Sequence, residues 1–402
     1  NNTTADNNVG VGAYALNANT TGTSNTAVGA NALDANTTGN SCTAVGYRSF
    51  SANTTGNGTA VGKDALLLNT TGIANTAVGA NCLDANTTAS YNTAVGNASL
   101  TANTTGSQNT AVGHDSLNDN TEGNFNIAVG SNALAANTTG DNNTAIGSAA
   151  LVANTTADNN TAIGRSVLSV NTTGSSNTAV GSNALDANTS GVSNVAVGTN
   201  ALSGNTTASD NVAIGVNCLV SNSTGTSNTA VGKNALFANT ASNNTAVGDD
   251  ALLLNTSGQK NVAIGAFALD SNTTASKNLA FGYAALTANT TGTENIAIGS
   301  SALKANTTAD SNVAIGESAL KISTTAHQLV AIGSEAGDTV TTGHNLIMLG
   351  YNSQPSSATA TDEITLGDAN IATLRCNTQT LSSLSDARDK TNVIDLPEGL
   401  GF

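Results

Sequence analysis

Apolar residues recur along the chain as two adjacent pairs per repeat, with a glycine and two mostly polar residues between the pairs. In the repeat that begins at Asn177 the pairs are Ala179-Val180 and Ala184-Leu185, and Gly181 follows the first pair. A repeat of this length is too short for a helix and a strand with their turns, and β-branched residues precede the glycine. The pattern therefore predicts short strands joined by turns.

The glycine of this Ala-(Val/Ile)-Gly motif sets the period of the chain. It recurs from Gly12 to Gly367 in nineteen steps of 17 residues and two of 16. Both short steps, Gly46 to Gly62 and Gly232 to Gly248, lose their residue between an Asn-Thr stretch and the next motif, which indicates a surface turn there. A regular period is typical of a solenoid in which each repeat is one coil. We predict an all-β fold, a parallel β-solenoid or β-roll of about 21 coils.

The motif glycine is present in every repeat. Glycine alone fits where φ is positive or where backbones crowd, and a tight bend between strands requires both. The turn position after Asn-Thr-Thr differs, because it holds glycine in some repeats (Gly140) and alanine in others (Ala157). We assign a structural role to the motif glycines, among them Gly29, Gly79, Gly113, Gly147, Gly181, Gly215, Gly265 and Gly299.

An asparagine recurs just before the Thr-Thr pair until Ser323 replaces it. Stacked amides can bond from coil to coil, and asparagine tolerates turn geometry. We therefore expect an asparagine ladder rather than a ligand site, although the Asn-Thr-Thr triplets are also formal glycosylation acceptors. The ladder includes Asn36, Asn86, Asn137, Asn188, Asn239 and Asn289.

The two neighbouring apolar residues of each pair indicate that several copies of the chain assemble side by side. Neighbouring residues of a strand point to opposite faces, so two apolar pairs imply that both faces are buried. We expect a parallel homo-oligomer, most simply a trimer, with its coils in register. Val180 and Leu185 would form one wall of an apolar seam and Ala179 and Ala184 the other, and the sequence leaves open which wall faces the partner.

The composition excludes most enzyme chemistry and several kinds of partner. Of the 402 residues only 9% are charged and 3% are aromatic, and there is no Trp, so convergent ionisable groups are scarce. The net charge of −15 and the scattered basic residues argue against nucleic acid. No apolar run approaches the ~20 residues that span a bilayer, so we expect no membrane insertion.

Candidate ligands are few and dispersed. His114, His327 and His344 fall in different repeats, so we expect no metal, and nothing indicates a cofactor. Cys82 and Cys218 share one repeat position and are interpreted as alanine substitutes in a core. Threonine-rich turns raise ice binding as a lesser alternative, but the Thr-Thr neighbours would point to opposite sides of a strand. Aspartates at one repeat position indicate a solvated face: Asp34, Asp84 and Asp186.

The repeat pattern loosens after residue 322. Gly337 replaces the leucine, and Tyr351 and Pro355 appear. The glycine spacing nevertheless survives to Gly367, so we expect altered coils to continue. We divide the chain into a regular shaft (1–322), degenerate coils and a neck (323–384), and a charged terminal segment (385–402).

Two family resemblances follow from these motifs. The Ala-Val/Ile-Gly repeats over residues 1 to about 333 resemble the YadA-like head repeats of trimeric autotransporter adhesins, which are trimeric parallel β-rolls. The terminal segment, from Asp362-Glu-Ile-Thr-Leu-Gly through Leu384-Ser-Asp-Ala-Arg-Asp-Lys to Phe402, is similar to the junction of phage tail fibres with an endosialidase-type intramolecular chaperone. That resemblance implies self-cleavage beside Ser385 as nucleophile with Lys390 as base, supported by Asp386 and Arg388.

Together these observations predict a structural protein. The favoured interpretation is the homotrimeric shaft of a phage tail fibre or related virion appendage, extracellular, used for host-surface attachment and matured by C-terminal self-cleavage. Its partners would be its own copies, other virion tail proteins and a host-surface receptor such as a glycan. A bacterial trimeric adhesin on the cell surface is the alternative. A sugar-degrading spike is a further one, but no carboxylate pair is placed for glycoside hydrolysis. We expect no enzyme activity apart from the single self-cleavage.

Overall fold

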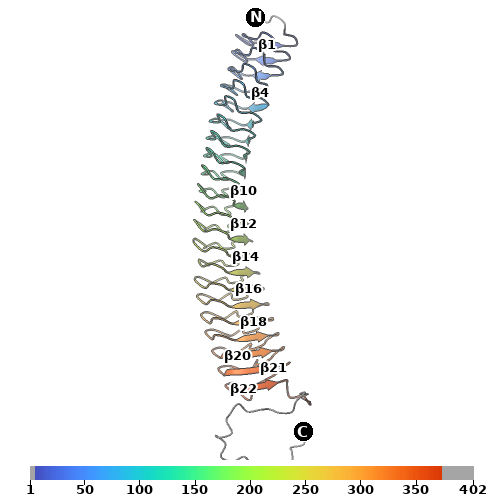
Figure 1. Ribbon diagram of the computed structural model, residues 1–402, viewed down its shortest axis with the longest axis vertical. Coiled ribbons are helices and arrows are strands. Elements are labelled where there is room, and N and C mark those ends of the chain that lie inside the picture. Colours follow the sequence, from blue (N-terminus) through green and yellow to red (C-terminus); the bar gives the residue numbers. More distant parts are fainter. Residues whose placement is uncertain (1–4, 374–402) are drawn as a thin grey trace, which may run out of the picture.

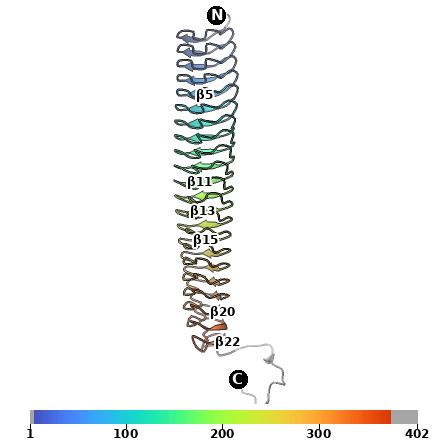
Figure 2. The same cartoon turned by 90° about the vertical axis from the view of Figure 1, so that its left-hand side faces the viewer.

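The computed structural model describes residues 5–373, and these form one long column of stacked coils. The coils follow one another in sequence order from the N-terminal to the C-terminal end of the column (Figures 1 and 2). The described residues contain strands and turns but no helix. The predicted all-β parallel solenoid with a period of about 17 residues is therefore confirmed.

Each coil contributes one short strand to a single parallel sheet of 22 strands. Every strand pairs with the strand of the next coil, as in the register Ala162↔Ala179↔Ala196. The strands are β1 (Val9–Val11), β2 (Thr26–Val28), β3 (Thr43–Val45), β4 (Gly58–Val61), β5 (Asn75–Val78), β6 (Thr93–Val95), β7 (Thr110–Val112), β8 (Ile127–Val129), β9 (Thr144–Ile146), β10 (Thr161–Ile163), β11 (Thr178–Val180), β12 (Val195–Val197), β13 (Val212–Ile214), β14 (Thr229–Val231), β15 (Thr245–Val247), β16 (Val262–Ile264), β17 (Leu279–Phe281), β18 (Ile296–Ile298), β19 (Val313–Ile315), β20 (His327–Ile332), β21 (His344–Leu349) and β22 (Thr361–Leu366).

The second apolar pair does not form a strand. Leu185 has a φ of 53°, in the left-handed region, and Asn183 two residues before it has a φ of 55°. The backbone therefore turns continuously instead of extending, although the Leu185 N–H still donates to the Ala201 carbonyl of the next coil at 2.9 Å. The prediction of a second strand in each repeat is wrong, because these alternating left-handed residues curve the chain around the core.

The interior is built from the two alanine columns and the leucine column. Ala179, Ala184 and Leu185 are all completely buried, and the same three positions are buried in coil after coil. The interpretation of Leu185 as a wall shared with Val180 is therefore wrong. In a turn, neighbouring side chains need not alternate between faces as they do in a strand, so both Ala184 and Leu185 point inward.

The motif glycines are fixed by both conformation and space. Gly181 has a φ of 126°, where side-chain-bearing residues are rare, and a Cβ placed on it would lie 2.6 Å from the Gly198 carbonyl oxygen of the next coil. No left-handed φ occurs at the turn glycine Gly140. The alanine at the equivalent position, Ala157, shows that this turn accepts a methyl group.

The last coils are broader than the others. Strands β20, β21 and β22 each span six residues, whereas the earlier strands span three or four. They continue the same parallel register, with His327↔His344 and His344↔Thr361 as partners. The column therefore keeps its coil-on-coil stacking through Leu366 while the coil itself changes shape.

Candidate functional site

The outward face of the sheet is the main candidate site of the described chain. Strands β2 to β20 each bury an alanine and direct the residues on either side of it outward, so that Thr178 and Val180 flank the buried Ala179. The residue that follows the alanine forms an apolar column along the sheet, aliphatic except for Phe281. Val28 is 36% exposed and Phe281 is 51% exposed, whereas Val180 and several other members are half-buried. The column presents a continuous apolar stripe to the surroundings.

The composition of this face changes along the column. At the position just before the buried central residue of the strand, the N-terminal half is mostly polar and the C-terminal half is mostly aliphatic. The N-terminal residues at this position are Thr26, Thr43, Thr59, Thr76, Thr93, Thr110, Ile127, Thr144, Thr161 and Thr178. The C-terminal residues are Val195, Val212, Thr229, Thr245, Val262, Leu279, Ile296, Val313, Val330 and Ile347. Two aliphatic columns therefore run side by side over most of the C-terminal half.

The predicted asparagine positions lie inside the coils and stack on one another. The Asn188 amide nitrogen donates to Asn171 Oδ1 at 2.8 Å and to the Gly191 carbonyl of its own turn at 3.1 Å. Asn188 is completely buried, as are its equivalents. Asn36, Asn137 and Asn289 donate to the preceding coil in the same way, at 2.9, 2.8 and 3.0 Å. These amides satisfy each other in the interior, where an unpaired polar group is costly.

A second asparagine ladder, which the sequence analysis missed, runs beside the first. Its members precede the strand, and Asn177 is typical: its N–H donates to Asn160 Oδ1 at 3.0 Å and its Nδ2 donates to the Gly191 carbonyl at 2.9 Å. The Gly191 carbonyl thus accepts from both ladders. The signal is present in the sequence, because an asparagine stands two residues before the alanine of the glycine motif in most repeats.

The ladders are interrupted at identifiable places. In the second ladder Cys42 replaces an asparagine, and its thiol lies 3.3 Å from the Gly56 carbonyl that an amide would otherwise reach. Gly58 replaces the next member and leaves no side chain there. In the first ladder the buried Oδ1 atoms of Asn205 and Asn222 have no hydrogen-bond partner. The two asparagine ladders are therefore regular but not identical from coil to coil.

The cysteines of the described chain are structural. Cys42, Cys82 and Cys218 are free and buried. Burial raises the pKa of the Cys42 thiol to about 11 and that of Cys218 to about 12, so both are thiols rather than reactive thiolates at neutral pH. Cys82 and Cys218 occupy positions that hold buried alanine in other coils. Cys376 lies outside the described residues.

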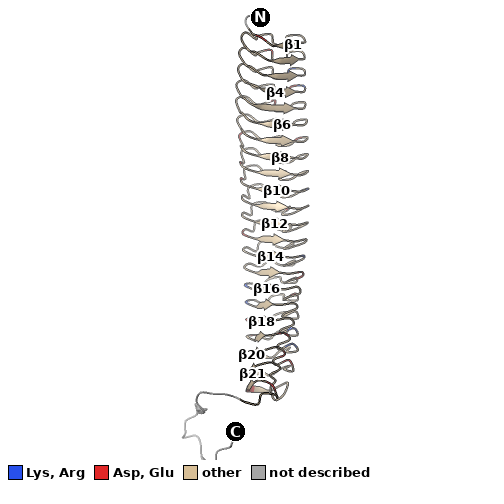
Figure 3. Ribbon diagram, turned by 90° about the vertical axis from the view of Figure 1, so that its right-hand side faces the viewer, with Lys and Arg blue, Asp and Glu red and all other residues tan. Residues whose placement is uncertain are grey.

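Charged residues are few and scattered along the column, as the ribbon colours of Figure 3 show. The tightest group is Asp64, whose side chain is 5% exposed and accepts from Arg48 Nε at 2.8 Å and from Lys63 Nζ at 2.7 Å. The hydrogen bond from Arg48 lowers the pKa of Asp64. Conversely, burial raises the pKa of Asp186, a half-buried member of the aspartate column expected to be solvated. Arg48 and Lys63 balance the charge of Asp64, whereas Asp186 lies in a distant coil, so these groups do not converge on a common point.

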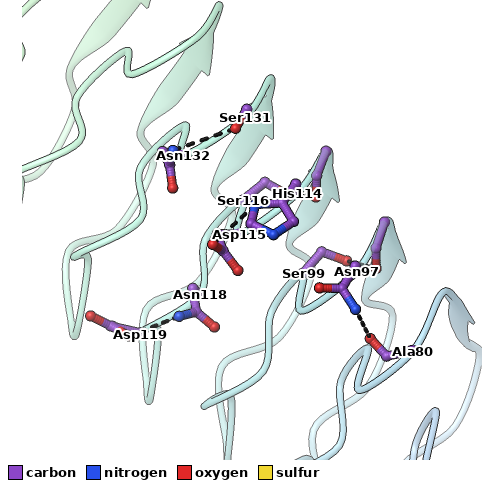
Figure 4. A network of polar contacts seen from close by, with 12 residues as sticks. Ala80, Asn97, Ser99, His114, Asp115, Ser116, Asn118, Asp119, Ser131 and Asn132 are labelled. Carbon is purple, nitrogen blue, oxygen red and sulfur yellow. Dashed lines mark hydrogen bonds and ion pairs between the residues drawn. The ribbon is translucent and has the colours of Figure 1, made fainter. Parts of the chain in front are cut away.

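The histidines occupy two different settings. His114 Nδ1 lies 3.0 Å from an Asp115 carboxylate oxygen on the turn after the motif glycine, beside the exposed Asn97 of the preceding coil (Figure 4). His327 and His344 are both exposed, and their rings stack with centroids 5.5 Å apart and an interplanar angle of 5°. Within residues 5–373 no three His, Cys, Asp or Glu side chains gather closely enough to hold a metal ion.

A shallow depression lies at the C-terminal end of the column. Its walls come from the turn after β21 and from the residues that follow β22, including Asn352, Gln354 and Asp368. Asp368 is its single charged lining residue, so the depression has no pair of groups suited to acid–base chemistry.

The four residues assigned to self-cleavage, Ser385, Asp386, Arg388 and Lys390, lie outside the described residues. Within the part of the chain that the structure does describe, no helix is long and apolar enough to cross a membrane. No protein-family model matches the chain, and no curated protein matches it. The outward sheet face, with the amide ladders behind it, is accordingly the feature on which a function can be argued.

Proposed function

We propose that the protein is the shaft of a homotrimeric fibre, most simply a phage tail fibre or related virion appendage that carries attachment to a host surface. The supporting observation is the aliphatic column on the outward sheet face, which continues from Val28 to Leu349 and stays partly exposed in a single chain. A stripe of this length is unusual for a protein that acts alone. Matching stripes on parallel copies would cover each other coil by coil.

The shape of the molecule fits a spacer role. Stacked coils about 4.8 Å apart convert sequence length directly into reach, which gives a column on the order of 100 Å for this chain. The interior is closed by alanine, leucine and asparagine and has no cavity that would serve a substrate among the described residues. A receptor, for example a surface glycan, would then be contacted by parts of the assembly that the shaft carries. A bacterial trimeric adhesin head is the alternative with the same architecture.

Self-cleavage by a C-terminal chaperone belongs to this proposal. Three chains of near-identical coils can pair out of register by one repeat at small local cost. A trimeric template at the C-terminal end would set the register first, and the doubly aliphatic C-terminal half of the sheet face would then associate before the threonine-bearing half. Ser385 and Lys390 are the residues proposed for release of that template.

The trimer is tested by placing charge on the aliphatic column. The variant Ile146→Glu/Ile163→Glu/Val180→Glu should lower the solution mass from three chains to one, measured by light scattering after gel filtration. The matched control, Thr139→Glu/Thr156→Glu/Thr173→Glu, adds the same charge to exposed turn positions and should keep the mass of the parent. A parent that is monomeric, or a trimer that survives in the first variant, would reject the proposed seam.

The cleavage is tested separately by the denatured mass of the protein expressed with its full C-terminus. We expect a break beside Ser385 that disappears in the Ser385→Ala variant. An uncut parent would remove the chaperone from the proposal and shift it toward an adhesin or an uncleaved fibre.

A second candidate function is ice binding, and one observation favours it. The strands of the N-terminal half place threonine and valine on one outward face, as Thr178 and Val180 do, and parallel strands repeat this face at regular spacing. The adjacent Thr-Thr pairs of the turns are a different set of residues. Thermal hysteresis of the purified protein tests this function, and its loss in the Ile146→Glu/Ile163→Glu/Val180→Glu variant would locate it on the sheet face.

A further inference from the structure

His327 and His344 form a pair of contacting imidazole rings on the surface of the column. The two residues are register partners on the adjacent parallel strands β20 and β21, and both side chains are exposed. Their rings are nearly parallel, at 5°, with centroids 5.5 Å apart. The chain has only three histidines. Two of them therefore meet face to face, while His114 follows β7, many coils away, and lies beside Asp115.

The position of the pair coincides with the end of both amide ladders. Asn312 is the last asparagine of the second ladder, and the buried Leu329 and Leu346 take its place in the next two coils. In the first ladder Asn306 is followed by Ser323 and then by Val340, and the buried Asn306 Oδ1 and Ser323 Oγ have no hydrogen-bond partner. The coils of β20 and β21 are thus joined without the side-chain amide bonds that join the regular coils.

The charged groups nearest the pair in the stack are already engaged. Asp310 stands one coil before His327, and its Oδ1 accepts from the Thr293 N–H and hydroxyl of the coil before that, at 2.6 and 3.0 Å. Asp362 stands beside Thr361, one coil after His344, and accepts from Asn345 Nδ2 at 2.7 Å. Neither carboxylate completes a three-ligand cluster with the two imidazoles.

We propose that His327 and His344 form a two-histidine site for a borderline transition-metal ion such as Zn²⁺, which clamps β20 to β21 from outside the coil. Neutral imidazole nitrogen is a preferred ligand of zinc, at about 2.0–2.1 Å. Adjacent strands lie about 4.8 Å apart, so rotation of two exposed side chains is enough to bring one nitrogen of each ring to a shared ion. Water fills the remaining positions. The clamp replaces, at the end of the shaft, the coil-to-coil connection that the asparagines provide elsewhere.

The experiment is calorimetric titration of the 402-residue protein with zinc chloride at pH 7.5 in chelator-free buffer. The parent should show one tight site per chain, and His327→Ala or His344→Ala should each abolish it. Loss even of a group that merely orients a metal ligand costs about 10–100-fold in affinity, so loss of one of two imidazoles should cost at least as much. The double variant should behave like either single variant, because both rings serve one ion.

The chain supplies a matched control in His114→Ala, which removes an exposed histidine that has no stacked partner. This control should keep the tight site. Zinc should also raise the melting temperature of the parent and of His114→Ala, but not of His327→Ala or His344→Ala, because only a site present in the folded state stabilises by mass action.

Three results would overturn the proposal: no tight zinc site in the parent, a site that survives both single substitutions, or equal and additive losses from all three histidine variants, which indicate independent surface imidazoles. The site lies within one chain, so its test is unaffected by the outcome for the trimer.

Discussion

Asn171 and Asn188 lie one coil apart, and the buried amide nitrogen of Asn188 donates to the amide oxygen of Asn171 at 2.8 Å. The same nitrogen donates to Gly191, whose carbonyl also accepts from Asn177 of the second ladder. Each amide thus holds its own turn closed and binds the coil before it. A thin interior of alanine and leucine is in this way supplemented by a buried polar network whose members are largely satisfied.

We predict that Asn188→Ala destabilises the protein. The substitution leaves the Asn171 amide oxygen and one acceptor position of the Gly191 carbonyl unpaired in the interior, which costs about 1–3 kcal/mol per unsatisfied group. The control is Asn97→Ala, because Asn97 is exposed and makes one long bond of 3.4 Å. Its effect should stay within about 0.5 kcal/mol. Chemical denaturation measures both, and equal midpoints for the two variants would show that the ladder contributes nothing.

Substitution of the two kinds of glycine should have unequal effects. Gly181→Ala forces a side chain into a φ of 126° and against the Gly198 carbonyl, so it should lower stability by ~1–3 kcal/mol from conformation alone and by more from the clash. A Cβ on Gly140 would also come close to a neighbour, 2.5 Å from the Ala157 carbonyl oxygen. Because Gly140 has no left-handed φ and the equivalent turns already hold alanine, Gly140→Ala should nevertheless cost less than Gly181→Ala. Thermal melting of the two variants makes the comparison. A smaller loss for Gly181→Ala would mean that its turn is not constrained as the structure indicates.

The leucine column should behave as core and not as an interface. Leu252→Ala removes a completely buried side chain and should cost about 2–5 kcal/mol. Leu254→Ala makes the same chemical change two residues away, where the side chain is 48% exposed, and should cost less than about 1 kcal/mol. Denaturant unfolding with the oligomeric state checked in parallel distinguishes the two. Dissociation of the oligomer by Leu252→Ala without loss of chain stability would restore the leucine seam.

Two aspartates should have opposite effects on the pH dependence of stability. The hydrogen bond from Arg48 lowers the pKa of Asp64. The ionised Asp64 carboxylate therefore adds to the free energy of unfolding above the ordinary aspartate pKa of about 3.9, and this contribution is lost as pH falls below that pKa. Burial raises the pKa of Asp186. Ionisation of Asp186 therefore opposes folding, and its effect is to lower the free energy of unfolding as pH rises above the ordinary aspartate pKa. Asp64→Asn should therefore destabilise at pH 7, and Asp186→Asn should stabilise slightly.

Unfolding free energies measured between pH 3 and pH 7 test this pair. Relative to the parent, the loss caused by Asp64→Asn should shrink at the acidic end, and the gain from Asp186→Asn should also shrink there. The same sign for both variants at pH 7 would contradict the assignment of hydrogen bonding to one carboxylate and burial to the other.

Much of the fold follows from local pattern. The motif glycine recurs at a fixed interval because each coil must place a residue without a side chain against the same atoms of the next coil, and Gly181 against Gly198 is one instance. Once the period is known, the parallel register of Ala179 with Ala196 follows, since equivalent residues stack. The first asparagine column was visible for the same reason. The second column has the same period as the first, with one asparagine before the strand in most repeats.

The sequence by itself determined the coil length and the parallel stacking, because these depend on repetition alone. The tertiary structure decided which apolar residues face outward. Alternation between faces holds only while a backbone is extended, and the left-handed φ of Leu185 turned that residue inward and left Val180 as the outer stripe. It also brought His327 and His344 together, because contact between single residues 17 positions apart depends on how two particular coils stack rather than on any local pattern.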